Sequence, residues 1–387
     1  MTGTTPTPRE PDPLEFDQPR VSIRKPEHRF DSQGETPDAS RVERAMNSFV
    51  RDFGRTAAVY MESCIHCGMC AEACHFYEVT QDPKYTPSWK LEPFKQAYKR
   101  EYGPFAFVYR ALNLKPKVTV DELQQWQHLL YDSCTVCGRC SLMCPMGIDI
   151  ASLVSQARHG MFKAGLVPHE LAAVTERARR EGSPLGATPR VFKDRCEWLA
   201  DEHEVEITID KPRAEVLCAM SSIEIMKYPE SVVATARIMR HVGADWTFRL
   251  DGYEATNFGL LTGDAAAQKE LTLKIIHAAV ACGASVVVLP ECGHAYTALR
   301  WMGANMYGKP LPFRVLHISE FLAEGVQSGK IGVKKLGKSL TFHDPCQVSR
   351  RGGAVDAPRV VLQALGVELR ETQDHGSLNW CCGGGGG

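Results

Sequence analysis

Eight of the 15 cysteines in this 387-residue sequence fall in two short runs with identical spacing. The first run contains Cys64, Cys67, Cys70 and Cys74. The second run contains Cys134, Cys137, Cys140 and Cys144, and Pro145 follows it directly. Thiolates placed this densely are ligands for iron–sulfur clusters or for zinc, so we expect the chain around both runs to fold about metal centres.

The spacing C-x-x-C-x-x-C-x-x-x-C is that of bacterial ferredoxins, in which three closely spaced cysteines bind one cluster and the fourth binds the other. It predicts two [4Fe-4S] clusters. The ligands of cluster 1 would be Cys64, Cys67, Cys70 and Cys144. The ligands of cluster 2 would be Cys134, Cys137, Cys140 and Cys74. Zinc is the competing metal, but zinc sites rarely combine a third cysteine at this offset with a fourth.

Composition narrows the class of protein further. The sequence has 45 Lys and Arg residues against 46 Asp and Glu residues, so it has no general attraction to nucleic acid or anionic membranes. Residues 1–40 lack the apolar segment of a secretory signal, so the cysteines indicate metal or redox chemistry rather than an exported disulfide framework. The most apolar stretch, 278–290, is broken by Gly283, so we expect no transmembrane span.

The sequence predicts a multidomain chain. Residues 1–40 are polar and rich in proline, which indicates a disordered tail. Residues 41–182 predict an α-helical two-cluster ferredoxin domain. Its expected helices cover 42–62, 91–102, 105–112, a segment that begins after a Thr119–Glu122 capping box, 149–163 and 169–180. Glycines and prolines between 182 and 189 predict a linker over 183–212.

Residues 213–387 alternate between strand and helix patterns, which predicts an α/β domain with a largely parallel sheet. The expected strands are 215–220, 246–250, 284–289, the start of 313–324, 340–343 and 367–371. The expected helices are 229–242, 264–281, the rest of 313–324 and 355–365. A strand with a nearby cysteine, a helix and a second strand occur in the same order at 216–250 and at 340–371, so the domain contains an internal repeat.

A third group of cysteines lies in the second repeat. The strand at 340–343 runs into His343-Asp344-Pro345-Cys346, and the last residues include Trp380-Cys381-Cys382 followed by glycines. Adjacent cysteines flanked by glycine place two sulfurs at one point and leave room for a bulky group. A flexible glycine-rich tail is the alternative interpretation.

The Asp344-Pro345-Cys346 and Cys381-Cys382-Gly383 segments resemble the cysteine-rich CCG domain. This domain forms the catalytic half of heterodisulfide reductases. It also occurs in iron–sulfur subunits of glycolate, lactate and anaerobic glycerol-3-phosphate dehydrogenases. A helical two-cluster ferredoxin domain ahead of two CCG modules is the family's common layout, and the resemblance covers residues 42–387. Within the family, segments 61–77 and 289–296 are most similar to DsrK proteins, catalytic subunits of membrane complexes tied to dissimilatory sulfite reduction.

The resemblance implies a further [4Fe-4S] cluster, noncubane in heterodisulfide reductases, with Cys346, Cys381 and Cys382 as catalytic ligands. A full module adds a C-x-x-C about 35 residues later, which we expect beyond Gly387 in a longer chain. The first module departs from the pattern. Cys218 and Cys292 match it, but Ala255-Thr256 stands where the cysteine pair belongs and Ala295 replaces the last cysteine. We therefore expect one catalytic cluster, in the second module.

Two histidines and several further cysteines are weaker candidates. His343 and His294 lie beside the cysteine positions, and either could protonate a leaving thiolate, or instead bond structurally at a strand end. Cys292 is a candidate to line the catalytic site or to be a core residue. Cys196 and Cys282 have no partners by spacing, and we expect Cys282 in the core.

The resemblance implies an oxidoreductase that acts on sulfur groups. Electrons would pass between a quinol-oxidising cytochrome b-type membrane subunit and the disulfide or trisulfide of a small DsrC-like sulfur-carrier protein. The chain would then be peripheral on the cytoplasmic face of the inner membrane, held there by partner subunits. The first alternative is an electron-relay subunit of a flavin-dependent 2-hydroxy-acid or glycerol-3-phosphate dehydrogenase. The second is an electron-transfer module without a catalytic cluster, with about eight irons per chain instead of about twelve.

Overall fold

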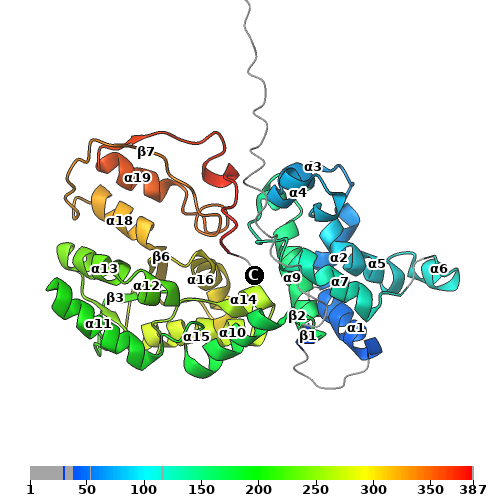
Figure 1. The fold of residues 1–387 in the computed structure, drawn as a ribbon, viewed down its shortest axis with the longest axis horizontal. Coiled ribbons are helices and arrows are strands. Elements are labelled where there is room, and N and C mark those ends of the chain that lie inside the picture. Colours follow the sequence, from blue (N-terminus) through cyan, green and yellow to red (C-terminus); the bar gives the residue numbers. More distant parts are fainter. Residues whose placement is uncertain (1–28, 31–37, 53, 115–116, 386–387) are drawn as a thin grey trace, which may run out of the picture.

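The computed structural model describes residues 29–30, 38–52, 54–114 and 117–385. A helical part and an α/β part lie side by side, and the C-terminal segment runs between them (Figure 1). Most of the predicted tail, 1–40, lies outside the described residues. Its described pieces have regular structure, because Arg29–Phe30 (β1) pairs antiparallel with Val167–Pro168 (β2) and α1 begins at Asp38.

The helical part consists of short helices, as predicted for residues 41–182. Their bounds are α1 (Asp38–Asn47), α2 (Gly54–Ser63), α3 (Met69–Glu72), α4 (His75–Thr80), α5 (Glu92–Glu101), α6 (Ala106–Ala111), α7 (Val120–Leu130), α8 (Arg139–Leu142), α9 (Ile150–Lys163) and α10 (His169–Glu181). A π-helical turn, η1 (Ser48–Asp52), interrupts the single helix expected over 42–62. Two 3₁₀ turns, η2 (Pro83–Tyr85) and η3 (Trp89–Leu91), lead into α5.

Capping side chains fix where the helices around the second cysteine run begin. The hydroxyl of Thr119 accepts a hydrogen bond from the Glu122 N–H at 3.2 Å, and Asp149 accepts one from the Ser152 N–H at 3.0 Å. Helices α7 and α9 then bury their apolar sides in one core. That core includes Leu123, Leu130, Leu153, Val154, Ala157 and Met161. The core therefore holds both ends of the second cysteine run in place.

Half of the predicted linker over 183–212 is instead helix α11 (Pro189–His203), so this part of the prediction is wrong. Thr188 caps this helix by accepting a hydrogen bond from the Val191 N–H at 3.3 Å. Pro189 occupies the first helical turn, where the missing N–H would have no intrahelical partner in any case. The helix buries Phe192 against the sheet, so the proline that indicates a linker in the sequence begins a packed helix instead.

The alternation predicted for residues 213–387 is confirmed. Strands β3 (Val216–Cys218), β4 (Trp246–Phe248), β5 (Val286–Leu289) and β6 (Arg314–His317) form a parallel sheet in the order β4-β3-β5-β6. The helices of this part include α12 (Ser222–Lys227), α13 (Glu230–His241), α14 (Phe258–Thr262), α15 (Ala265–Ala281), α16 (Gly293–Thr297), α17 (Gly303–Tyr307) and α18 (Ile318–Gln327), with a π-helical turn η4 (Ala298–Met302).

Successive residues of β3 point to opposite faces of this sheet, and each face has its own helical layer. Val216 and Cys218 pack with residues of α11 and α13, whereas Leu217 packs with residues of α15 and η4. A sheet covered on both faces explains why its strands are continuously apolar. Cys282 is buried beneath the second layer, as expected.

The internal repeat appears as a second, smaller sheet. Strands β7 (Ser339–Leu340) and β8 (Glu368–Leu369) are parallel, and α19 (Asp356–Ala364) connects them. This is the same strand–helix–strand order that joins β3 to β4. The α/β part therefore contains two modules, and both present the ends of parallel strands where cysteines of the sequence pattern occur.

One loop of the α/β part is anchored deep in the helical part. The Tyr131 hydroxyl donates a hydrogen bond to the Thr262 carbonyl at 2.9 Å, and the Arg158 guanidinium donates one to the Leu261 carbonyl at 3.1 Å. Gly263 has a positive φ of 83°, and a Cβ built there would lie 2.4 Å from the Arg158 carbonyl carbon. Only glycine therefore fits at this contact between the two parts.

We expect Gly263→Ala to lower the free energy of unfolding by about 3 kcal/mol, because it adds a backbone clash to the cost of a left-handed conformation. Gly243→Ala is the matched control. Gly243 also has a positive φ, 62°, but open space surrounds it, so its substitution should cost only about 1 kcal/mol. Denaturant unfolding of both variants measures the difference. Equal destabilisation would show that the loop can move away from Arg158.

Candidate metal centres

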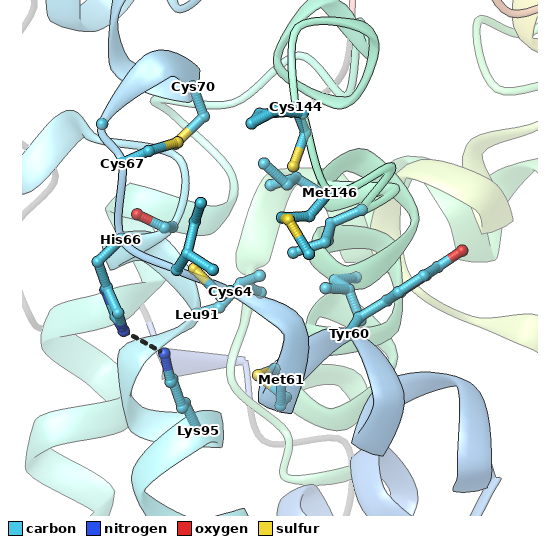
Figure 2. Close-up of a pocket in the computed structure, with 17 residues that line it drawn as sticks. Tyr60, Met61, Cys64, His66, Cys67, Cys70, Leu91, Lys95, Cys144 and Met146 are labelled. Atoms are coloured by element: carbon cyan, nitrogen blue, oxygen red, sulfur yellow. Dashed lines mark hydrogen bonds between the residues drawn. The ribbon is translucent and has the colours of Figure 1, made fainter.

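Four cysteine thiols line a cavity of about 50 Å³ in the helical part (Figure 2). They are Cys64, Cys67, Cys70 and Cys144. Gly68 adopts a positive φ of 82° and starts α3, which brings Cys67 and Cys70 to the same side of the cavity. Cys144 reaches the cavity from the end of the second run. We call this cavity the first cysteine site; it contains the ligand set predicted for cluster 1.

The other four cysteines of the two runs line a cavity of about 30 Å³, which we call the second cysteine site. They are Cys74, Cys134, Cys137 and Cys140. Gly138 has a φ of 79° and starts α8, as Gly68 does for α3. A Cβ at Gly138 would lie 2.9 Å from the Arg351 side chain, so this glycine also permits close approach of the α/β part. The fourth cysteine of each run thus lies in the other run's cavity.

The chemistry of these cavities fits a cluster better than a single ion. A zinc ion lies about 2.3 Å from each thiolate, which draws four sulfurs into mutual contact. Among the described residues, no three His, Cys, Asp or Glu side chains are close enough together to hold one ion. Burial raises the pKa of Cys140 well above its ordinary value, so bound cations are needed to stabilise four thiolates there.

The three cysteines of the second module form a third group. The sulfurs of Cys346 and Cys381 are 4.0 Å apart. The N–H of Gly383 donates to the Cys381 sulfur at 3.4 Å, and the N–H of Gly384 donates to the Cys382 sulfur at 3.4 Å. The glycines therefore form part of a sulfur-binding turn, because N–H donors stabilise charge on the sulfurs. We call Cys346, Cys381 and Cys382 the CCG cysteines.

The CCG cysteines lie against the second cysteine site. The Thr135 hydroxyl is 3.2 Å from the Cys381 sulfur. A hydrogen bond with Cys381, together with burial, raises the pKa of Cys137. The hydrogen bond with Cys381 lowers the pKa of Cys346 despite burial, so of these two thiols Cys346 holds negative charge more readily, because the pKa of Cys381 is raised. The structure thus brings together two groups of cysteines that are more than two hundred residues apart.

Polar contacts that the sequence analysis did not identify hold the two groups together. The Arg350 guanidinium donates to the Cys137 carbonyl at 2.9 Å, and Gln347 donates to the Val136 carbonyl at 3.1 Å. The Arg139 guanidinium stacks on the Trp380 ring at 3.6 Å from its centroid and donates to the Leu378 carbonyl at 2.9 Å. Arginine spacing gives no sequence signal for such contacts. They arise only when the two parts pack.

Asp344 has a structural role. It is buried, and its carboxylate accepts two hydrogen bonds from Arg359 at 2.8 Å and one from the Gly376 N–H at 2.6 Å. Although burial alone would raise the pKa of Asp344, these donors hold it below its ordinary value. This fully bonded carboxylate fixes the turn that carries Cys346 to the segment that carries Cys381.

The two candidate histidines differ in position. His343 is exposed, three residues before Cys346. His294 lies in α16, and a Cβ at Gly385 would lie 3.0 Å from its ring, so His294 is the histidine next to the glycines of the CCG cysteines. Burial, with Arg158 and Arg351 nearby, lowers the pKa of His294 to about 4. The ring is therefore neutral at pH 7 and has no imidazolium proton to donate.

Cys218 and Cys292 do not join the CCG cysteines. Cys218 is fully buried in the layer between the sheet and α13, and Cys292 packs against the core on the opposite face. Cys196 is also buried, in α11. Burial raises the pKa of Cys292 to about 12, which keeps it a neutral thiol. Cys218 and Cys196 are therefore core residues, whereas Cys292 is half-buried at the edge of the core.

Three carboxylates occupy the strand ends of the first module, and the sequence analysis missed them. Ser221 donates from its hydroxyl to Glu291 at 2.5 Å and from its N–H to Glu224 at 3.0 Å. Glu254 accepts from the Ser222 N–H at 3.2 Å. Burial, reinforced by Glu291 and Glu254, raises the pKa of Glu224 to about 7. Isolated glutamates after strands give no pattern that distinguishes this cluster from surface charge.

Comparison with known families supports both parts of the chain. Residues 60–148 match the 4Fe-4S dicluster domain, and residues 340–387 match the cysteine-rich CCG domain. No solved structure matches the chain.

Several relatives cover most of the chain. The chain is 27% identical to the Hdr-like menaquinol oxidoreductase iron–sulfur subunit 2 of Archaeoglobus fulgidus, over 86% of this chain and 68% of that protein. It is 27% identical to one polypeptide of the dihydromethanophenazine:CoB–CoM heterodisulfide reductase of Methanosarcina barkeri, over 84% of this chain and 78% of that polypeptide. It is also 27% identical to an EtfAB:quinone oxidoreductase of Syntrophomonas wolfei, over 87% of this chain and 50% of that protein.

The chain is an iron–sulfur oxidoreductase subunit that joins a ferredoxin-type dicluster domain to a CCG domain. Within this class it is similar to the Methanosarcina heterodisulfide reductase polypeptide and to iron–sulfur subunits of Hdr-like quinol oxidoreductases. The resemblance drawn from the cysteine motifs is therefore confirmed.

We expect Cys74→Ser to change the same cluster as Cys140→Ser, because both thiols line the second cysteine site. Cys144→Ser should instead change the cluster that Cys70→Ser changes. Each variant should lose about four irons per chain or alter one of two EPR signals of the reduced protein. Cys196→Ser, buried in α11, is the control and should keep both signals. If Cys74→Ser and Cys70→Ser altered the same signal, the fourth cysteine of the first run would bind the cluster of its own run, and the prediction would be wrong.

We expect Glu224→Gln to flatten the pH dependence of stability. The folded-state pKa of Glu224, about 7, lies above its ordinary value of 4.5, so the folded protein binds the extra proton between these values. Stability from this group is present below pH 4.5 and is lost as pH rises to 7, by about 3 kcal/mol. Thermal unfolding between about pH 5 and 8 measures this, and Glu368→Gln on the exposed strand β8 is the control. Parallel pH profiles for wild type and Glu224→Gln would contradict it.

Proposed function

We propose that this chain passes electrons from a membrane quinol-oxidising subunit through its two cysteine sites to a disulfide or trisulfide at the CCG cysteines. One observation carries the proposal. Cys381 lies between Cys346, 4.0 Å away, and Thr135 of the second cysteine site, 3.2 Å away. A group bound at the CCG cysteines would thus lie beside the second cysteine site, with no gap that electrons must cross through solvent.

The residues of the chain suit such a reaction. Two [4Fe-4S] clusters in the cysteine sites, and a third at the CCG cysteines, would supply one-electron steps. The N–H groups of Gly383 and Gly384 stabilise sulfur-centred charge where the substrate sulfurs would arrive. Cleavage of a disulfide consumes two electrons and two protons and releases two thiols. With His294 neutral, its ring does not supply a stored proton for this step.

We infer the partners from the relatives. The name of the Archaeoglobus relative includes menaquinol, and another relative, 27% identical, is called a probable membrane-anchored ferredoxin in Chromohalobacter salexigens. Among the described residues, no helix has the length and apolar character needed to cross a bilayer. We therefore propose that a cytochrome b-type subunit holds this chain at the cytoplasmic face of the inner membrane. A small DsrC-like sulfur-carrier protein is the proposed substrate.

Cluster re-oxidation tests the proposed thiol chemistry. The chain, with its clusters reduced and excess reductant removed, is mixed with a protein trisulfide or a small mixed disulfide under anaerobic conditions. We expect bleaching of the visible absorbance to reverse, and Cys381→Ser to slow this by roughly 100-fold or more while about eight irons per chain remain. Cys196→Ser should react like wild type. Equal rates for Cys381→Ser and wild type would rule the CCG cysteines out as the reaction site.

A relay to quinone without thiol chemistry is the second candidate. The similarity to the EtfAB:quinone oxidoreductase of Syntrophomonas wolfei favours it. In that case the reduced chain would be re-oxidised by a soluble quinone analogue and would not react with disulfides. Iron near eight rather than about twelve per chain in the wild type would also favour the relay.

A further inference from the structure

Lys90 is a buried cation at the second cysteine site. Its side chain is 1% exposed and lines the cavity. The ammonium lies 3.9 Å from the Cys74 sulfur, donates a hydrogen bond to the Ser133 carbonyl and faces the Phe76 ring, with 5.2 Å to the ring centroid. None of these partners carries a formal negative charge when the thiol is protonated. The cation is thus withdrawn from water without an anionic partner.

Two arginines bond the backbone of cysteines whose side chains line the same cavity. Arg158 is 0% exposed, and its guanidinium donates to the carbonyls of Cys134 at 2.6 Å, Leu130 at 2.9 Å and Leu261 at 3.1 Å. Arg350 is half-buried; it donates to the Cys137 carbonyl at 2.9 Å and to the Ser377 and Asn379 carbonyls, and its second terminal nitrogen is buried without a hydrogen-bond partner. In the described part of the chain, none of these three cations forms a salt bridge, although Asp132 lies within electrostatic range of Arg158.

Charges withdrawn from water without an anionic partner are costly, so a fold that keeps two buried cations and one half-buried cation beside one cavity favours an anion inside it. Four cysteine thiolates carrying an iron–sulfur cluster would be that anion, because such a centre is negatively charged and becomes more so when reduced. We propose that Lys90, Arg158 and Arg350 form a cationic cage that raises the reduction potential of the cluster in the second cysteine site above that of the cluster in the first.

The first cysteine site lacks an equivalent cage among the residues that the structure describes. The cation that lines it, Lys95, is 2.9 Å from a His66 ring nitrogen, and Glu62 and Glu92 lie within electrostatic range of Lys95. These carboxylates offset the positive charge. Cys67 is exposed, so water screens charge at this site. Hydration of the exposed site also favours its reduced form, but a screened and partly neutralised cation acts less strongly than buried charges in a low dielectric.

The cage gives electron transfer a direction. One electron that leaves the first site and arrives at the second oxidises one cluster and reduces the other, and the electron then rests beside Cys381. This consequence rests on the proposed function, in which the CCG cysteines receive electrons. The difference in potential does not, because it belongs to the chain's own residues and is measured without any thiol substrate.

A potentiometric titration followed by EPR tests the cage in the full, cluster-loaded chain. Lys90→Gln keeps a hydrogen-bond donor for Ser133 and removes the charge, so we expect the higher of the two cubane potentials to fall. Lys90→Arg keeps the charge and should leave that potential near its wild-type value. Lys95→Gln is the matched control, because Lys95 is also buried, and it should leave the higher potential unchanged. Cys74→Ser identifies which signal belongs to the second site.

Four outcomes overturn the proposal: unchanged potentials in Lys90→Gln, a shift of the lower potential instead, equal shifts in Lys90→Gln and Lys90→Arg, or loss of the cluster in both. Loss of the cluster in Lys90→Gln with its retention in Lys90→Arg supports a requirement for charge. Arg350→Gln provides a second, independent measurement and should lower the same potential. If the potentials shift as expected but the chain does not reduce disulfides, the proposed function is contradicted and the proposal of a cationic cage is still supported.

Discussion

The exchange of one cysteine between the two runs constrains the helical part. Each run lines its own cavity with three thiols and sends the fourth to the other cavity. This arrangement requires the two runs to lie together, with α3 and α8 starting at equivalent glycines. The chain between Cys74 and Cys134 must therefore start and end beside the two cavities. Its helices do so by packing against α9, which follows the second run directly.

Local signals in the sequence predicted much of this fold. The caps at Thr119 and Asp149 and the apolar runs at β3 and β5 act over a few residues, so their elements could be placed from the sequence. Helix α11 was missed because Pro189 has the same local preference in a linker and in a first helical turn. The contact of Arg350 with the Cys137 carbonyl was not predictable, since it depends on how the two parts pack.

The two modules of the α/β part share a strand order but place their cysteines differently. In the second module, Asp344 fixes a turn that exposes Cys346 toward Cys381. In the first, Cys218 lies within the strand itself and is covered by α13, while Glu224 and its neighbouring carboxylates occupy the strand ends. A cysteine within a parallel strand is therefore a core residue here, whereas one a few residues beyond the strand lies beside other cysteines. Cysteine identity alone does not distinguish the two.

The stacking of Arg139 on Trp380 has a consequence for the rate of the proposed electron transfer. Electron tunnelling weakens exponentially with distance, whereas the enthalpy of packing changes gently. This stack, with the hydrogen bond from Arg139 to the Leu378 carbonyl, sets the width of the seam between the helical and α/β parts. A small opening there would leave the proposed cluster ligands in place and would still slow the proposed electron transfer. In the proposed electron path, the rate of transfer across the seam would therefore depend on how rigidly this stack and the neighbouring hydrogen bonds of Arg350 and Gln347 hold the two parts together.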